Sequence, residues 1–422
     1  MKYKKHEMGS YNLHTIKTDK FKTIVVKIVF RRDVNKEELT LRNLLSDVMI
    51  RSTRKYNTSR LMQIEVEDLY GIDYNSSVAI SGSYSMLSFD YTFLNDNYTE
   101  KGNAEKTFQF ITDMIFSPDI ISGKFNEDNF ELSKNYLKEV IESTKENPSE
   151  YSIHRLLEEM DDKSPVSFRA DGYVEDLDKI TPKSLYEYYK SVISKDIVDI
   201  FIIGDIEDFK IKRLAEKYFV LNTFKKKSHA HFIEDNKIRL KIKNKTETEN
   251  FNQSNLAIGA NIINPTFFEK SYVSFVYNFV LGGGTESKLF REVRENNSLC
   301  YAISSSIYRL NNMMVITSGL SSENAKKAVS IIKKEVKNMT LGKFEKEDVM
   351  KAQINYVSSL KQIYDSPYGI INIYLCKDFL KFDLLDKKIM MIGKVTKKDV
   401  VKFAKKIKLN TIYLLEGENV DE

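Results

Sequence analysis

The chain has 422 residues, 42% hydrophobic and 30% charged, a composition typical of a globular protein with a substantial core. Its formal net charge of +5 is too small a surplus on this length to indicate a nucleic-acid-binding protein. Two cysteines, Cys300 and Cys376, exclude a disulfide framework and a cysteine zinc site.

The chain starts with basic residues that no apolar segment follows, so we expect no signal peptide. No apolar run approaches the roughly 20 residues that span a bilayer. We therefore expect a cytoplasmic protein without membrane or nucleic-acid partners. In chain order, apolar patterns then predict strands at residues 21–30 and 76–94.

A helical segment that starts at Gly123 recurs at Gly342, and Pro148 and Pro367 keep the same spacing. The segments "ITPKSLYEYYK" and "VTKKDVVKFAKK" form a second matching pair, and each predicts a helix capped by a threonine, Thr181 or Thr396, and followed by an apolar strand. These repeats predict a duplicated α+β fold. We expect each half to be an antiparallel sheet packed with helices, not a doubly wound parallel sheet.

The two halves join through a polar segment. We predict a first half at residues 1–221, a linker with an edge strand at 222–250, and a second half at 251–422. Within the linker, residues 225–231 (KKKSHAH) are polar and expected to be mobile, whereas 237–245 (KIRLKIKNK) alternate basic and apolar residues from Lys237 to Lys243. Alternation with lysines predicts an edge strand protected against unwanted pairing. A nucleic-acid stripe is disfavoured because no aromatic residues are interleaved.

The second half is predicted to contain strands at residues 253–262 and 302–310, and between them lies "LGGGTESKLFREVRENNSLCY". The three glycines precede a helix whose cap is Thr285 or Ser287. A phosphate loop requires glycine, four residues and then Gly-Lys-Ser/Thr, which this order does not provide, so we exclude nucleotide binding. The glycines instead allow a tight turn and a close approach to neighbouring backbone.

Within this helix, Leu289 and Val293 share one face suited to the core, and Phe290 and Arg294 share an adjoining face. The polar run NNS then ends the helix, and a strand begins at Tyr301. A helix, a turn and a strand can bring Arg294 and Tyr301 side by side. On spacing alone, however, a surface arginine and a packed tyrosine are the simpler interpretation.

The same stretch resembles the C-terminal-half motif of the insulinase/pitrilysin family of zinc metallopeptidases. Five positions match that motif: Leu289, Phe290, Val293, Arg294 and Tyr301. Cys300 departs from it, since the family usually has glycine or alanine there. The resemblance covers nearly the whole chain and implies a clam shell of two homologous halves around a peptide. It also implies that Phe290, Arg294 and Tyr301 contact the substrate, with Arg294 and Tyr301 reaching the zinc site from the half opposite the metal.

The family's zinc motif, His-x-x-Glu-His, is missing. At its place the chain reads "NLLSD", so that Asn43 and Asp47 replace the histidines and Ser46 replaces the general base. Glu139 lies where the last ligand is expected, but it is more simply a solvated helix carboxylate. Without two imidazoles, we expect this chain to hold no zinc and to perform no hydrolysis alone.

The other candidate groups offer no substitute site. None of the five histidines lies in a metal motif; they are His6, His14, His154, His229 and His231. The last two lie in the lysine-rich linker without a third ligand. Cys300 has no neighbouring histidine in the sequence and is better interpreted as a small apolar residue than as a nucleophile.

Two functions stay open. Bacterial members of the family often work as heterodimers in which one subunit holds zinc and the other keeps the Arg/Tyr pair. The resemblance therefore implies an accessory subunit that acts on a peptide with a zinc-bearing partner, Tyr301 stabilising the oxyanion and Arg294 holding a carbonyl or carboxylate. In the partner's absence, a homodimer stays open as an alternative assembly. The second hypothesis is a structural or peptide-binding scaffold without a catalytic role.

Overall fold

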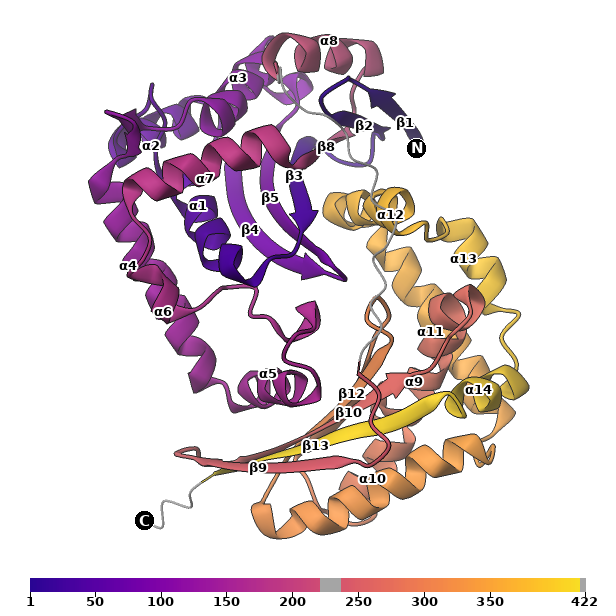
Figure 1. Ribbon diagram of the computed structural model, residues 1–422. Helices are drawn as coiled ribbons and strands as arrows, with labels where there is room; N and C mark the ends of the chain where they lie inside the picture. The colour runs from indigo at the N-terminus through magenta and orange to yellow at the C-terminus, as the bar shows by residue number, and fades with distance from the viewer. Residues whose placement is uncertain (221–236, 418–422) are drawn as a thin grey trace. The chain divides into compact units, whose positions relative to one another are not determined.

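In the computed structural model, which describes residues 1–220 and 237–417, the chain is built around two large β-sheets (Figure 1). The strand order of the first is β1 (Lys2–Glu7), β2 (Asn12–Lys17), β8 (Ile197–Gly204), β3 (Thr23–Asp33), β5 (Tyr84–Leu94) and β4 (Asp73–Ser81). The order of the second is β11 (Ala302–Tyr308), β12 (Met313–Leu320), β10 (Ser254–Ile262), β13 (Ile407–Gly417) and β9 (Lys243–Glu249).

The two sheets have the same topology. Read from one edge, β2-β8-β3-β5-β4 corresponds to β9-β13-β10-β12-β11, and β1 is an addition to the first sheet. Pairing is antiparallel except for one parallel pair in each sheet, β2 with β8 and β13 with β9. The predicted duplicated α+β fold is thus confirmed, and the predicted strands correspond to β3, β4, β5, β10 and β11.

The repeated turn signals also recur in three dimensions. Gly123 and Gly342 both have left-handed backbone, with φ of 77° and 69°, which a residue without Cβ adopts freely. They precede α4 (Glu127–Ser143) and α11 (Lys346–Ile363). Thr181 and Thr396 both form capping boxes, at the start of α7 (Pro182–Lys195) and α14 (Lys397–Ala404). The predicted caps are therefore confirmed.

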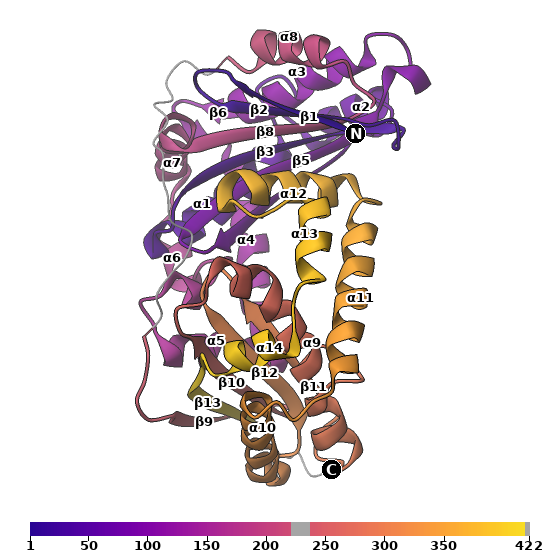
Figure 2. The ribbon, with the colours of Figure 1, turned by 90° about the vertical axis from the view of Figure 1, so that its right-hand side faces the viewer.

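In each sheet, one apolar face forms the main core with several helices. In the first unit the core joins Ile28 and Phe30 of β3 to α1 (Leu39–Arg51), α3 (Asn103–Phe116) and α7. In the second, the core joins β10 to α9 (Ser274–Gly282), α10 (Ala325–Thr340) and α14, and Figure 2 shows α9 and α14 beside the strands. Further helices are α2 (Ser59–Asp68), α6 (Val174–Leu177), α8 (Asp208–Tyr218) and α13 (Leu385–Ile392). None of the described helices has the length and apolarity that crossing a bilayer requires.

The compact units do not follow the predicted halves 1–221 and 251–422. Among the described residues, the first unit contains Met1–Glu142, 169–220 and Ser366–Asn372, and the second contains Ser143–Phe168, 237–365 and 373–417. Helix α5 (Pro148–Met160) therefore belongs to the second unit, and the first turn of α12 (Pro367–Leu380) belongs to the first. The two repeats have exchanged equivalent helical segments.

Helix α5 is attached to the second sheet by apolar and polar contacts. Met160 packs so closely on Gly259 of β10 that a Cβ there would lie 2.1 Å from the Met160 sulfur. At the edge of the sheet, the Glu247 carboxylate of β9 accepts hydrogen bonds from Tyr151 (2.7 Å) and Arg155 (3.0 Å) of α5. Although desolvation opposes it, these hydrogen bonds hold the pKa of Glu247 below its usual value.

The predicted edge strand is displaced along the chain. Residues 237–242 form no strand; β9 begins at Lys243 and is indeed at the sheet edge. Arg239 instead donates to the last carbonyls of α5, those of Glu159 (3.0 Å) and Met160 (3.2 Å), while Leu240 is exposed. The hydrogen bonds of the Arg239 guanidinium to the C-terminus of α5 thus outweigh the strand preference of residues 237–242. The predicted mobile segment 225–231 lies outside the described residues.

Candidate functional site

Asn43, Ser46 and Asp47, which the resemblance places at the zinc motif, lie on α1 of the first unit, and their side chains bond within the protein. The Asn43 amide donates to the carbonyl of Ala170, and the Ser46 hydroxyl donates back to the Asn43 carbonyl at 2.7 Å. Asp47 accepts a hydrogen bond from Arg51, one turn later on the helix, at 2.6 Å. All three polar groups therefore have internal partners.

Glu139 lies on α4, a helix that α1 contacts. Arg51 donates to Ser133 of α4 at 2.7 Å, so Ser133 marks the point of α4 that α1 approaches. Glu139 is exposed and lies six residues further along, about 9 Å along the helix axis. Within the described part of the chain, neither Asp47 nor Glu139 belongs to a group of three or more side chains close enough to hold a metal ion.

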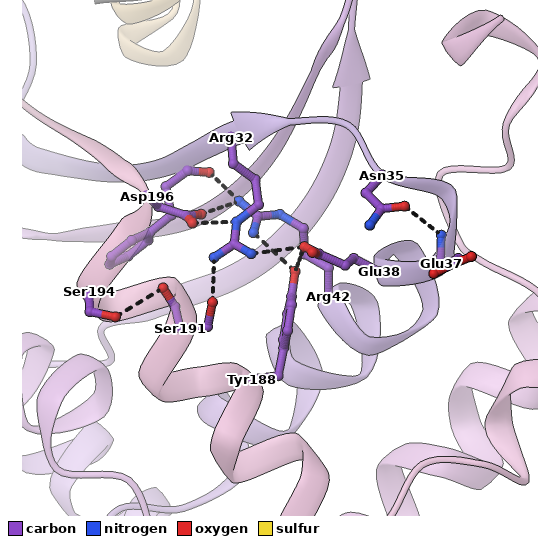
Figure 3. Close-up of polar contacts among 10 residues, drawn as sticks. Arg32, Asn35, Glu37, Glu38, Arg42, Tyr188, Ser191, Ser194 and Asp196 are labelled. Carbon is purple, nitrogen blue, oxygen red and sulfur yellow. Dashed lines mark hydrogen bonds and ion pairs between the residues drawn. The ribbon is translucent and has the colours of Figure 1, made fainter. Parts of the chain in front are cut away.

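A buried ion-pair network holds α1 in place (Figure 3). Arg42, 1% exposed, donates to Asp196 at 2.7 Å and to the Phe30 carbonyl at 2.7 Å. Arg32 of β3 reaches the other oxygen of the same carboxylate at 2.5 Å and also bonds Glu38 at 2.9 Å. This carboxylate lies between two guanidinium groups, which fixes the helix that carries Asn43 and Asp47 against the sheet.

The glycine stretch of the second unit has the packing role predicted for it. A Cβ on Gly282 would lie 2.9 Å from the backbone nitrogen of Ser305 in β11, and one on Gly283 would lie 2.7 Å from the Phe279 Cα. Gly284 has open space around it. The first two glycines therefore permit the close approach of α9 to β11 and the turn that follows.

The helix after the glycines is a π-helix at Phe290–Glu295. The Ser287 hydroxyl accepts from the Phe290 amide at 3.4 Å, which makes Ser287 the cap. Leu289 and Val293 are fully buried, as predicted from their spacing. The helix ends where the NNS run begins, with the Asn296 amide bonded to the Arg291 carbonyl at 2.8 Å. Such wide turns occur frequently at functional sites.

Arg294 lies on the exposed side of this π-helix. Its guanidinium carbon is 4.8 Å from the centroid of the Phe290 ring, a cation–π contact that orients the group. Among the described residues no carboxylate pairs with it. The predicted shared face of Phe290 and Arg294 is confirmed, although through a π-helical rather than an α-helical turn.

Tyr301 is 70% exposed, and its backbone amide donates to the Gly319 carbonyl of β12 at 2.9 Å. Within the described chain its hydroxyl has no hydrogen-bond partner, and no contact joins it to Arg294; their joint action stays a prediction. Cys300 lies between Arg294 and Tyr301 in the sequence. Burial raises the pKa of its thiol despite the Arg294 charge, which fits an apolar rather than a nucleophilic cysteine.

One anchoring residue was not recognised from the sequence. Lys288, which opens the helix, pairs with Glu335 of α10 at 3.0 Å, and both side chains are largely buried. Glu335 occurs on the apolar stripe formed by Ile332, Val336 and Met339, and a carboxylate on such a stripe is a signal for a buried cationic partner.

The three described histidines do not form a zinc site of the family type. His6 pairs with Asp208 at 2.8 Å, and His14 is buried beside Asp199 at 3.2 Å in the first sheet. His154 lies on α5. His229 and His231 lie outside the described residues.

Comparisons with known proteins identify relatives of this arrangement. A family model described as "Peptidase M16 inactive domain" matches residues 179–356. The chain is 28% identical over 419 residues to the "Probable inactive metalloprotease YmfF" of Bacillus subtilis, covering 98% of this chain and 97% of that protein. It is 29% identical over 221 residues to the "Uncharacterized zinc protease YmxG" of the same organism, covering 51% of each chain.

A solved structure has the same fold along its whole length. The "conserved protein from Enterococcus faecalis V583" superposes with a TM-score of 0.93 at 26% identity, and the match covers 100% of both chains. This likeness confirms the duplicated fold along the whole chain. Residues 179–356 thus match the peptidase M16 inactive domain, and nearly the whole chain is similar to a probable inactive metalloprotease, in agreement with the resemblance that its sequence motif carries.

Proposed function

We propose that this chain is the accessory subunit of a two-chain zinc peptidase and supplies Arg294 and Tyr301 to a homologous zinc-bearing partner. The contrast between the two motif regions carries the proposal. The side chains at 43, 46 and 47 are bonded internally and include no imidazole, whereas Arg294 and Tyr301 are exposed. A relative described as a zinc protease over half of the chain supports a homologous partner.

The chemistry assigned to this chain is binding and charge stabilisation. A zinc ion held by the partner polarises the scissile carbonyl and activates water when bound. The Tyr301 hydroxyl donates a hydrogen bond to the oxyanion as charge develops on it. Arg294 donates to a substrate carbonyl or carboxylate, and Phe290 supports its guanidinium plane while leaving the N–H edge available.

Co-expression with a homologous subunit that carries His-x-x-Glu-His tests the proposal. We expect zinc and peptide cleavage to require the partner, and we expect neither chain alone to cleave. Arg294→Ala should lower kcat/KM of the complex by about 10- to 100-fold, because a hydrogen bond to a charged group contributes ~1.5–3 kcal/mol. Arg291→Ala on the same helix, also exposed, is the matched control and should leave the rate unchanged.

Zinc content and complex formation must be measured on the same samples. If the complex forms and cleaves peptide at an unchanged rate with Arg294→Ala, the chain is a scaffold without a catalytic role. Tight zinc and proteolysis by the isolated chain would contradict both functions.

A further inference from the structure

Helix α10 of the second unit has one face buried in the core and one face covered by lysines. The buried face includes Ala328, Ile332 and Val336. The five lysines of the helix are all exposed: Lys326, Lys327, Lys333, Lys334 and Lys337. Because positions seven and eleven residues apart fall on the same side of a helix, these ammonium groups share the solvent-exposed face.

These lysines have no counter-charge in the described part of the chain, where none of them forms an ion pair. The one carboxylate in the sequence of α10, that of Glu335, is buried. Several exposed lysines elsewhere pair with a carboxylate one turn away, as Lys179 does with Asp176 at 2.8 Å. On α10 the spacing instead brings Lys333 and Lys337 together, and like charges four residues apart destabilise a helix. This charge pattern therefore does not serve the stability of α10.

The positive surface continues onto α14. Gly342, just after α10, lies against α14, since a Cβ there would be 3.3 Å from the Val401 side chain. Three lysines at one side of α14 and its C-cap are exposed: Lys398, Lys402 and Lys405. The Asp399 carboxylate of the same helix accepts hydrogen bonds from Thr396 in the capping box. We refer to the eight lysines of α10 and α14 as the lysine face.

The side chains of the lysine face distinguish between kinds of anionic partner. Neither helix exposes an aromatic ring, so the face offers no stacking for nucleic-acid bases. Lysine ammonium groups are hydrated point charges without the bidentate geometry of arginine, which suits a diffuse anionic surface. Leu341, four residues after Lys337 and therefore on the same side, is 58% exposed. An apolar side chain among lysines has a favourable environment at a lipid interface.

We propose that the lysine face and Leu341 bind the surface of an anionic lipid bilayer. Clusters of four to eight lysines on one helix surface are typical of such binding, and each lysine near the lipid raises the affinity about fivefold. The sequence led us to expect no membrane partner, because the net charge of the whole chain is only +5. That sum conceals the lysine face, whose charge exceeds it, so the remainder of the chain is net negative. The proposal requires no spanning helix, no zinc and no partner subunit.

Co-sedimentation of the full chain with vesicles tests the lysine face. We expect binding to phosphatidylcholine vesicles that contain about 30% phosphatidylserine and no binding to pure phosphatidylcholine vesicles. Salt at about 0.5 M should abolish binding, because it screens the charges. The triple variant with Lys333→Gln, Lys334→Gln and Lys337→Gln should bind about 100-fold more weakly. Its Tm should not fall below that of the wild type, because the substitutions remove like-charge pairs.

A second triple variant is the matched control. Lys179→Gln, Lys190→Gln and Lys210→Gln remove the same charge from exposed lysines of the first unit that pair with carboxylates. This variant should change the vesicle affinity less than about threefold. Leu341→Ser should weaken vesicle binding about fivefold, because it removes an apolar contact, and should leave any binding to duplex DNA unchanged.

Three outcomes would overturn the proposal: no binding to the anionic vesicles, equal weakening by the two triple variants, or tighter binding to duplex DNA than to the vesicles. The last result would assign the lysine face to a nucleic acid.

Discussion

The two motif regions, one on α1 and one at residues 281–301, differ in whether their polar side chains are bonded internally or exposed. On α1, the side chains that the resemblance places at the zinc motif are bonded to the protein itself: Asn43 to a loop carbonyl, Asp47 to Arg51. In the second region the scaffold is tightly packed, but the polar ends of Arg294 and Tyr301 face outward. The polar groups of the first region thus form part of the internal structure, whereas those of the second are exposed to solvent.

The contrast between the two motif regions depends first on the ion-pair network that holds α1 against the first sheet. Asp196→Ala should have the largest effect on stability, lowering the free energy of unfolding by about 3–5 kcal/mol, because two arginines lose a carboxylate and Arg42 is left buried without it. Urea denaturation followed by circular dichroism measures the change. Asp178→Ala removes an exposed ion pair with Lys134 and should cost less than about 1 kcal/mol. Equal effects of the two substitutions would show that the network does not anchor the helix.

The region at residues 281–301 should be destabilised by substitutions at its tight turn. Gly282→Ala places a methyl group 2.6 Å from the Ser305 hydroxyl, so we expect a loss of about 1–3 kcal/mol from overpacking. Gly284→Ala, two residues away with open space around the Cα, should change stability by less than about 0.5 kcal/mol. The midpoint of urea denaturation distinguishes them, and a neutral Gly282→Ala would remove the reason given for the glycines.

The smallest effect is expected at Asp47, which the resemblance places at a ligand position of the zinc motif. Asp47→Ala removes a partly exposed (i, i+4) ion pair and should cost less than about 1 kcal/mol, since Arg51 keeps its bond to Ser133. The same substitution should leave the metal content of the chain unchanged. A loss of bound metal measured by atomic absorption would mean that Asp47 still acts as a ligand.

Much of the fold could be predicted because its signals are local. Threonine caps, left-handed glycines and apolar strand patterns each specify their own segment, and their repetition revealed the duplication. The exchange of α5 could not be predicted, because an amphipathic helix encodes an apolar face but not which of two similar sheets covers it. Arg239 shows the same limit of local signals: its segment alternates like a strand, but a tertiary contact with the end of α5 determines its conformation.

In the candidate site at residues 281–301, only the spacing of the residues along the sequence carries a signal. Leu289 and Val293 are recognisable as core positions from the sequence, and the family motif directs attention to Arg294 and Tyr301. The π-helical turn that presents Arg294 has no local sequence signal. Lys288 was overlooked because its partner, Glu335, lies on another helix and becomes apparent only when α10 packs.

The most direct test of the central contrast is the rate of peptide cleavage by the complex with a zinc-bearing partner when Tyr301 is replaced by phenylalanine. Tyr301→Phe removes one hydroxyl and should lower kcat by about 10²–10³ without releasing zinc, as expected for the loss of one oxyanion donor. Tyr98→Phe, at another exposed tyrosine, should leave kcat unchanged. An unaltered kcat in the Tyr301 variant, with the complex intact, would contradict the account.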